Sequence, residues 1–210
     1  MAESKATNRL DRGPILVLWT TLAIGALLAG IWVSTPGPIP ALRLAIRLTA
    51  RTSFALFALA FSAAPLRVLV PGAFSSYLIQ NRRYLGLSFG ISHLYHLGAI
   101  VLLIGQGNAS RAGGAAAFLP GGFLYLWIFF MMATSSNRAV RWVGPTRWAL
   151  LHRMGMYFIF LGFLKGFGLP LAQDPLTYGP LFALLMAVLA LRLWAWKIQK
   201  RRADLAPALH

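Results

Sequence analysis

Apolar residues along this chain gather into long runs that are separated by short joints rich in glycine and proline. A helix that crosses a membrane needs about 20 mainly apolar residues. Six stretches meet that requirement, and they are residues 14–34, 49–70, 83–105, 115–134, 146–169 and 176–196. The pattern predicts an all-α fold, namely a polytopic membrane protein built as a six-transmembrane-helix bundle.

The joints read "STPGPIP", "PGAFSS", "GQGNASRAGG", "GPT" and "GLPLAQDP", and all are too short to hold a soluble domain. The first apolar run is longer than the apolar core of a signal peptide, so we expect it to be a retained helix. The chain then divides into a cytoplasmic tail at residues 1–13, a transmembrane domain at 14–197 and a basic cytoplasmic tail at 198–210.

Lysine and arginine near the helix ends predict the orientation, because cytoplasmic loops carry the excess of these residues. Most of them fall on one side if the N-terminus is cytoplasmic. We therefore expect a multi-pass protein of the inner (plasma) membrane with both termini in the cytoplasm.

Arg43, Arg47 and Arg51 recur at every fourth position. The stretch "ALRLAIRLTAR" is either a short amphipathic helix on the outer surface or an extension of the second apolar helix.

Composition agrees with a membrane location, since 58% of the residues are hydrophobic and 11% are charged. A soluble domain carries about 25% charged residues. The net charge of +16 comes from basic residues that flank the apolar runs, so their partner is the head groups of the lipid bilayer and no nucleic acid is expected.

The supply of metal-ligating and acidic side chains is small. There is no cysteine, which excludes disulfides, iron–sulfur clusters and thiolate chemistry. There are four acids, and all except Asp174 lie in the tails. Sites built from paired carboxylates are therefore not expected.

Ionisable side chains inside membrane helices are costly and usually functional. Those of this chain are His93, His96, His152, Arg153 and Lys165. His93 and His96 are three residues apart and so share one helix face. At 1.5 Å per residue, His93 lies about 15 Å and His96 about 20 Å into the third span, while His152 lies about 9 Å and Lys165 about 28 Å into the fifth.

Imidazoles from two parallel helices suit the iron of haem, which takes one axial ligand on each face of the porphyrin. Zinc is the alternative, but it favours three or four converging ligands, and no thiolate or carboxylate lies near these histidines. A buried histidine can also do no more than hydrogen-bond a carbonyl or a serine of a neighbouring helix, and Ser88 and Ser92 are available for such contacts.

Two segments resemble the ferric reductase-like transmembrane domain family, over roughly residues 50–170. The first is "APLRVL" followed by "NRRYLGLSFGISHLYHLG", in which a Pro-Leu-Arg turn ends a helix and His96 takes the place of a haem-ligating histidine. The second is "TSSNRAVRWVGPTRWALLHRMG", which places His152 in a Trp-x-x-Leu-His-Arg motif. The closest relatives that this suggests are the haem-bearing membrane subunits of periplasmic methionine sulfoxide reductase systems.

The chain departs from this family at one position, because Lys165 stands where family members usually carry a further histidine. Three readings follow. Lys165 ligates iron as a neutral amine; or one haem site is altered, with His93 replacing a ligand and pairing with His152; or no haem binds and Lys165 extends to the interface.

The resemblance implies a b-type haem electron-transfer subunit that holds one or two haems and relays electrons to an acceptor at the outer face. Quinol or a flavoprotein is the expected donor, and a periplasmic reductase is an expected partner. If the chain is part of an enzyme, it is one component of an oxidoreductase. The alternative from another class is a haem-free helical scaffold or a small transporter derived from the same fold.

Overall fold

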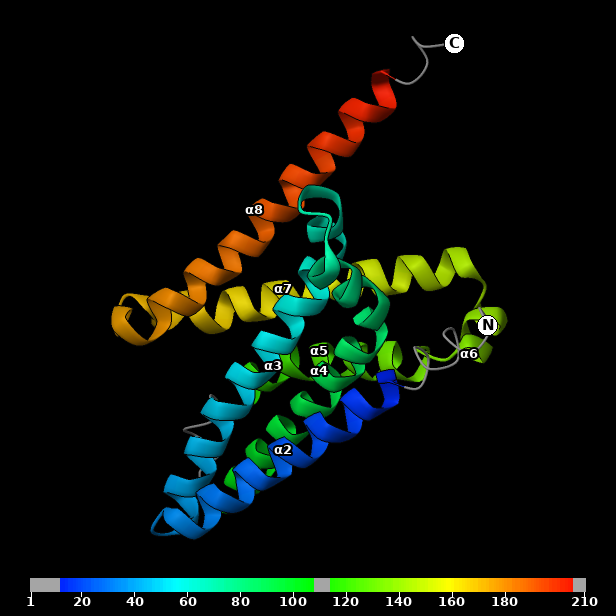
Figure 1. Ribbon diagram of the computed structural model, residues 1–210. Helices are drawn as coiled ribbons and strands as arrows, with labels where there is room; N and C mark the ends of the chain where they lie inside the picture. The colour runs from blue at the N-terminus through cyan, green and yellow to red at the C-terminus, as the bar shows by residue number, and fades with distance from the viewer. Residues whose placement is uncertain (1–11, 108–113, 206–210) are drawn as a thin grey trace. The chain divides into compact units, whose positions relative to one another are not determined.

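The computed structural model describes residues 12–107 and 114–205, which form seven helices and no strand (Figure 1). In chain order the helices are α2 (Arg12–Ser34), α3 (Pro38–Leu69), α4 (Ala73–Gly105), α5 (Gly114–Ala133), α6 (Asn137–Val143), α7 (Pro145–Leu171) and α8 (Pro175–Leu205). The all-α prediction is confirmed. The N-terminal tail up to residue 11, the joint at 108–113 and the last five residues of the C-terminal tail lie outside the described residues.

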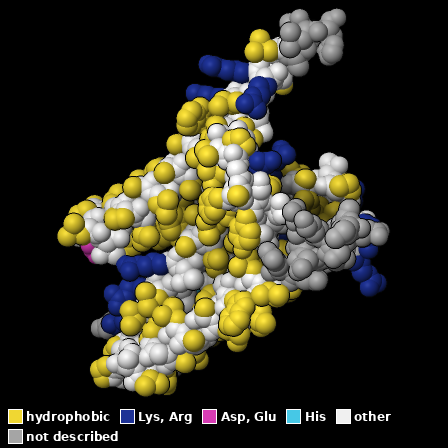
Figure 2. Space-filling model, viewed as in Figure 1, with side chains coloured by type: hydrophobic (Ala, Val, Ile, Leu, Met, Phe, Trp, Pro, Cys, Tyr) yellow, Lys and Arg dark blue, Asp and Glu magenta, His cyan; other side chains and the backbone are white. Residues whose placement is uncertain are grey.

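Five of these helices, α2, α3, α4, α7 and α8, are long and apolar enough to cross a membrane. Within α5 the shorter apolar segment Gly121–Ala133 is found. Large apolar side chains such as Trp19, Leu102 and Leu169 are exposed on the helices, and Figure 2 shows hydrophobic side chains spread along the visible helices. The chain is therefore a helical membrane protein, because such a surface is suited to lipid and not to water.

Three helices extend beyond the apolar runs that predict them. α3 begins at Pro38 instead of residue 49, α4 begins at Ala73 instead of 83, and α8 continues to Leu205. The stretch "ALRLAIRLTAR" is thus an extension of the second apolar helix, and the alternative of a separate surface helix is wrong. Helical hydrogen bonding does not require apolar side chains, so α3 includes the polar residues that precede its apolar run. The helix begins directly after Gly37, whose φ of 86° lies outside the helical region and favours glycine.

Two expectations about helix ends also change. The Pro-Leu-Arg segment does not end α3, because the helix continues through Pro65 to Leu69. The short helix α6 was not predicted from the apolar pattern. It begins where Ser136 Oγ accepts a hydrogen bond from the Ala139 N–H at 3.0 Å, and it ends at Gly144, whose φ is 87°.

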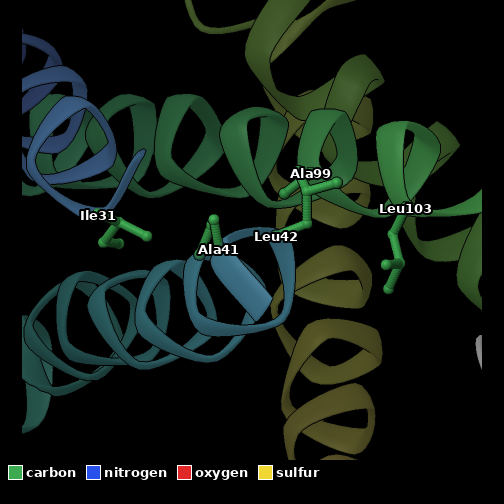
Figure 3. Close-up of a cluster of buried hydrophobic side chains, with 6 residues drawn as sticks. Ile31, Ala41, Leu42, Ala99 and Leu103 are labelled. Atoms are coloured by element: carbon green, nitrogen blue, oxygen red, sulfur yellow. The ribbon is translucent and has the colours of Figure 1, made fainter. Parts of the chain in front are cut away.

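The chain divides into two compact units. The first consists of Met1–Phe57 with Arg83–Gly155, and the second consists of Ala58–Arg82 with Met156–His210. In the first unit an apolar cluster joins α2, α3 and α4, and Figure 3 draws its members as sticks. The members are Ile31, Ala41, Leu42, Ala45, Ala99 and Leu103. Three of the six are alanines, whose small side chains let the helices approach closely.

Glycines bring α5 close to its neighbours in the first unit. A Cβ atom on Gly90 of α4 would collide with Met132 of α5, and one on Gly155 of α7 would collide with Trp127 and Met131 of α5. The Trp127 indole N–H donates to the carbonyl of Leu151 on α7 at 3.2 Å. α5 is therefore packed between backbone surfaces of α4 and α7.

Aromatic rings form the interior of the second unit. Phe61 of α3 is fully buried, and its ring lies 5.8 Å from that of Phe160 and 6.1 Å from that of Tyr157, both on α7. Leu185 of α8 is also fully buried. Asp174, the acid outside the tails, accepts a hydrogen bond from the Thr177 N–H at 3.1 Å and so caps the start of α8.

Candidate functional site

A row of small polar side chains lies where α3 packs against α4 in the first unit. Thr49 and Ser53 are four residues apart on α3, and Ser88 and Ser92 are four residues apart on α4. All four are fully buried, and Ser53 Oγ donates to Ser92 Oγ at 2.9 Å. His96 continues the row one helical turn further along α4. We call these five residues the polar seam.

The ring of His96 is fixed through its Nδ1 atom. This nitrogen lies 3.0 Å from the carbonyl oxygen of Ile46 and 3.1 Å from Thr49 Oγ1. The carbonyl can only accept, and the Thr49 hydroxyl already donates to the carbonyl of Ala45 at 2.6 Å. Nδ1 therefore carries the proton and donates. The lone pair is on Nε2, which makes no hydrogen bond to any described residue.

This arrangement has two chemical uses. A histidine that binds a metal through one nitrogen usually donates its other ring N–H to a carbonyl, which fixes the tautomer and the ring orientation. The same bond across α3 and α4 also holds two membrane helices together. His96 thus makes the expected contact between helices through Nδ1. Its Nε2 atom keeps the lone pair with which a histidine can bind a metal.

The ring of His93 lies among three other aromatic rings. The centroid distances are 5.3 Å to Phe89, 5.1 Å to His96 and 5.1 Å to Tyr125 of α5. The predicted proximity of His93 and His96 on one face of α4 is confirmed. Since both rings project from that face, both would approach an iron from the same side, and they cannot be the two axial ligands of one haem.

Two buried polar atoms of α4 and α5 have no hydrogen-bond partner among the described residues. They are the hydroxyl oxygen of Tyr125, whose ring contacts His93, and Oγ of Ser88, two turns before His96. Leaving such an atom unsatisfied costs about 1–3 kcal/mol. The sequence did not identify Tyr125 as a candidate site residue, because aromatic residues such as those of "FLYLWIFF" also pack between ordinary helices. Its hydroxyl group was the one feature that set it apart from the other residues of this run.

His152 of α7 is hydrogen-bonded through its Nε2 atom, whereas His96 is held through Nδ1. Its Nε2 lies 3.2 Å from Thr134 Oγ1, and that hydroxyl donates to the carbonyl of Phe130 at 2.7 Å. The Thr134 hydroxyl has one proton, so Nε2 donates to it when that proton goes to the Phe130 carbonyl and accepts from it otherwise. The Trp148 ring lies 4.3 Å from the imidazole, and its indole N–H donates to the Thr134 carbonyl at 2.9 Å. Binding iron through Nε2 would require that the bond to Thr134 break.

The remaining ionisable candidates are placed differently. Arg153 of α7 is exposed in the first unit, and Lys165 of α7 is exposed in the second unit. Among the described residues, no group of three or more His, Cys, Asp or Glu side chains could hold a metal ion. The zinc alternative therefore has no ligand set in that part of the chain.

Comparison with known proteins returned no relative: no protein-family model, no curated protein and no solved structure matches the chain.

Proposed function

We propose that this chain is a transmembrane b-type haem electron-transfer subunit, similar in role to the ferric reductase-like domain that its sequence resembles. The observation that carries the proposal is the His96 ring, whose Nδ1–H is held by the Ile46 carbonyl while Nε2 keeps its lone pair. This is the state in which imidazole binds iron.

The residues around His96 suit such a group. The rings of Phe89 and Tyr125, which contact the neighbouring His93, offer apolar surface to a porphyrin, and the Tyr125 hydroxyl has no hydrogen-bond partner among the described residues. Haem held there would supply one-electron oxidation and reduction. The protein would fix the ring of the ligand, keep water away and provide the polar contacts.

The other residue that would hold the haem is His152 or Lys165. His93 would support His96 from the same helix face instead of opposing it. His152 would need to exchange its Thr134 bond for iron, and Lys165 would ligate as a neutral amine. The number of haems, one or two, depends on which of these residues binds iron. Variants of His152 and Lys165 distinguish the two possibilities.

The proposal includes the topology. α5 supplies the sixth span, so that both termini lie in the cytoplasm of the inner membrane. Electrons enter from quinol or from a flavoprotein and leave at the outer face to a periplasmic reductase partner. The chain itself would be one component of an oxidoreductase.

A visible spectrum of the purified full chain tests the proposal. We expect a Soret band and sharp b-type bands that shift on reduction with dithionite. His96→Ala should lose the most haem, Lys165→His should retain more than the parent, and a larger loss in His152→Ala than in Lys165→Ala would identify His152 as the second ligand. No Soret band after expression with added haem would refute the proposal.

The second candidate function is a haem-free helical scaffold, which the polar seam favours because its hydrogen bonds join α3 to α4. His96→Asn separates the two functions. The Asn amide can still donate to the Ile46 carbonyl, but it provides no counterpart of Nε2. A haem subunit would lose its haem in this variant and match the thermal stability of the haem-free parent, whereas a scaffold would show no bound haem in either protein.

A further inference from the structure

The short helix α6 has two unlike faces. Successive residues of a helix are about 100° apart, so that positions 139, 140 and 143 share one side and positions 138, 141 and 142 share the other. The first side is half-buried and apolar, with Ala139, Val140 and Val143. The second side is exposed, with Arg138, Arg141 and Trp142. We call these last three residues the outer face of α6.

Trp142 is the most exposed of the seven tryptophans, with 88% of its surface free, against 66% for Trp19, the next in order. A large ring gains free energy when it leaves water, yet this one lies beside two arginines and away from the apolar side of its own helix. Tryptophan is enriched where a membrane meets water, because its ring is apolar and its N–H needs a polar partner. The exposed ring is therefore suited to the head-group level of a bilayer.

Three features fix the direction of the outer face. At the start of α6, Ser136 Oγ accepts a hydrogen bond from the Ala139 N–H at 3.0 Å. Asn137 Oδ1 accepts one from Nη1 of Arg83, on α4, at 2.9 Å. At the end of α6, Gly144 has a φ of 87° and turns the chain directly into α7. The outer face is thus presented by a helix that other parts of the first unit hold in place.

The place of α6 in the chain sets the outer face near the membrane surface (Figure 1). Gly144 alone separates α6 from α7, so the Cα atom of Trp142 lies within about 11 Å of Pro145, the first residue of α7. α7 is long and apolar enough to cross a membrane. Its 27 residues measure about 40 Å, which is the thickness of a bilayer with its head groups, whereas the hydrocarbon core alone measures about 30 Å. Pro145 and the outer face therefore lie at the level of the head groups.

Arginines give this part of the chain charge of one sign. Arg138, Arg141 and Arg147 are all exposed, and none of them makes a hydrogen bond or an ion pair with a described residue. Residues 134–147 include no acid. Arg147 lies in the first turn of α7, where the helix dipole disfavours a cation. Three arginines beside an exposed tryptophan complement a negatively charged surface with an apolar layer beneath it, as in an anionic lipid leaflet.

We propose that the outer face of α6, together with Arg147, binds the phosphate groups of anionic phospholipids, with the Trp142 ring inserted between the head groups. Arginine N–H groups match the oxygens of phosphate in pairs, and insertion of an apolar ring adds to the electrostatic attraction. The leaflet is the cytoplasmic one under the topology proposed above, but the contact itself does not depend on haem. It would hold the start of α7, the helix that carries His152, at a fixed depth in the membrane.

The absence of cysteine from the chain allows a local test. Trp142→Cys introduces a single thiol, and a nitrobenzoxadiazole label on that thiol reports whether the position lies in the membrane. Because Trp142 is exposed, its replacement should not affect folding. The full chain is placed in nanodiscs of phosphatidylcholine that contain increasing proportions of phosphatidylglycerol and a nitroxide-labelled lipid, which quenches the label on contact. We expect quenching to rise with the proportion of phosphatidylglycerol.

The arginines of α6 are tested in the same labelled chain. Arg138→Gln with Arg141→Gln should raise the proportion of phosphatidylglycerol needed for half-maximal quenching by at least about fivefold, the contribution of one basic residue near such a surface. Arg43→Gln with Arg47→Gln is the matched control, an equal charge change at exposed positions of the same unit, and it should behave like the parent. Native mass spectrometry of the unlabelled chain, with Trp142 in place, should show less retained phosphatidylglycerol in the α6 variant.

Three outcomes would overturn the proposal. Equal quenching at every proportion of phosphatidylglycerol would show that α6 has no preference for anionic head groups. No quenching in any nanodisc would show that the outer face is turned to water, where an acidic protein would be its partner. An equal shift in the control variant would show that the total charge of the protein, and not α6, attracts the lipid.

Discussion

The two units satisfy buried polar groups in different ways. In the first, the polar seam consists of neutral side chains, and Ser53, Ser92 and His96 find their partners across the contact of α3 with α4. In the second, the Phe61 carbonyl of α3 would normally accept the N–H of residue 65, which is a proline and has none. Arg192 of α8 brings a full charge among aromatic rings and donates to this carbonyl instead. The neutral groups of the first unit satisfy one another, whereas the charge of Arg192 is met by a backbone carbonyl, a hydroxyl and two aromatic rings.

This difference determines how much stability each unit should lose when one of these side chains is replaced. Neutral hydrogen bonds between membrane helices are worth little, because the separated helices find other partners. A charge-assisted bond to an otherwise open carbonyl is worth more, since its loss leaves a buried acceptor unsatisfied. The second unit should therefore be the more sensitive of the two to single substitutions.

The largest effect is expected from Phe61→Ala, which removes a fully buried ring that contacts Phe160, Tyr157 and Arg192. We expect the free energy of unfolding in mixed micelles to fall by about 3–5 kcal/mol. Leu59→Ala, at an exposed position of the same helix, should change it by less than about 0.5 kcal/mol. Equal losses in both variants would mean that Phe61 does not lie in a packed interior.

A smaller effect is expected from Arg192→Met, about 1.5–3 kcal/mol of unfolding free energy, because the Phe61 carbonyl loses its donor. The loss should shrink when Pro65→Ala is present, since the N–H of the new residue can fill that carbonyl from within α3. A double-mutant cycle in micelles measures the difference. The same cost in both backgrounds would contradict the role that we assign to Pro65.

The smallest effect is expected in the polar seam. A double-mutant cycle of Ser53→Ala and Ser92→Ala should give a coupling of about 0.6 kcal/mol, the usual value between membrane helices. Thr52→Ala paired with Ser92→Ala is the control, because Thr52 bonds the Leu48 carbonyl of its own helix and should show no coupling. If the coupling energy between Ser53 and Ser92 exceeds the unfolding free energy lost in Arg192→Met, the first unit is the more sensitive of the two, contrary to our expectation.

The sequence alone was sufficient to predict the existence of the apolar helices but not their length. Apolar runs report the part of a helix that lies in lipid, and they end where polar residues begin. The helical hydrogen bonds of α3 and α4 continue past that point, to Pro38 and Ala73. α6 has only seven residues and none of them is buried, so its cap at Ser136 was the clearest available signal.

The candidate site was predictable to the same limited extent. The three-residue spacing of His93 and His96 is a local property of one helix, and it was sufficient to predict their contact. The partner of His96 was not predictable, because Ile46 lies in the part of α3 that the apolar pattern left out. The Phe61 carbonyl and Arg192 are 131 residues apart, and no local pattern connects them.

Pro65 has a consequence for the order in which the protein is made. The acceptor that it exposes on α3 is filled by a residue that the ribosome adds 131 positions later, roughly 7–26 s at ordinary rates of translation. During that interval the nascent α3 enters the bilayer with a defect that its own sequence cannot repair. A translation product that stops before α8 would keep the Phe61 carbonyl unsatisfied. Membrane quality control could recognise the incomplete product by this exposed acceptor.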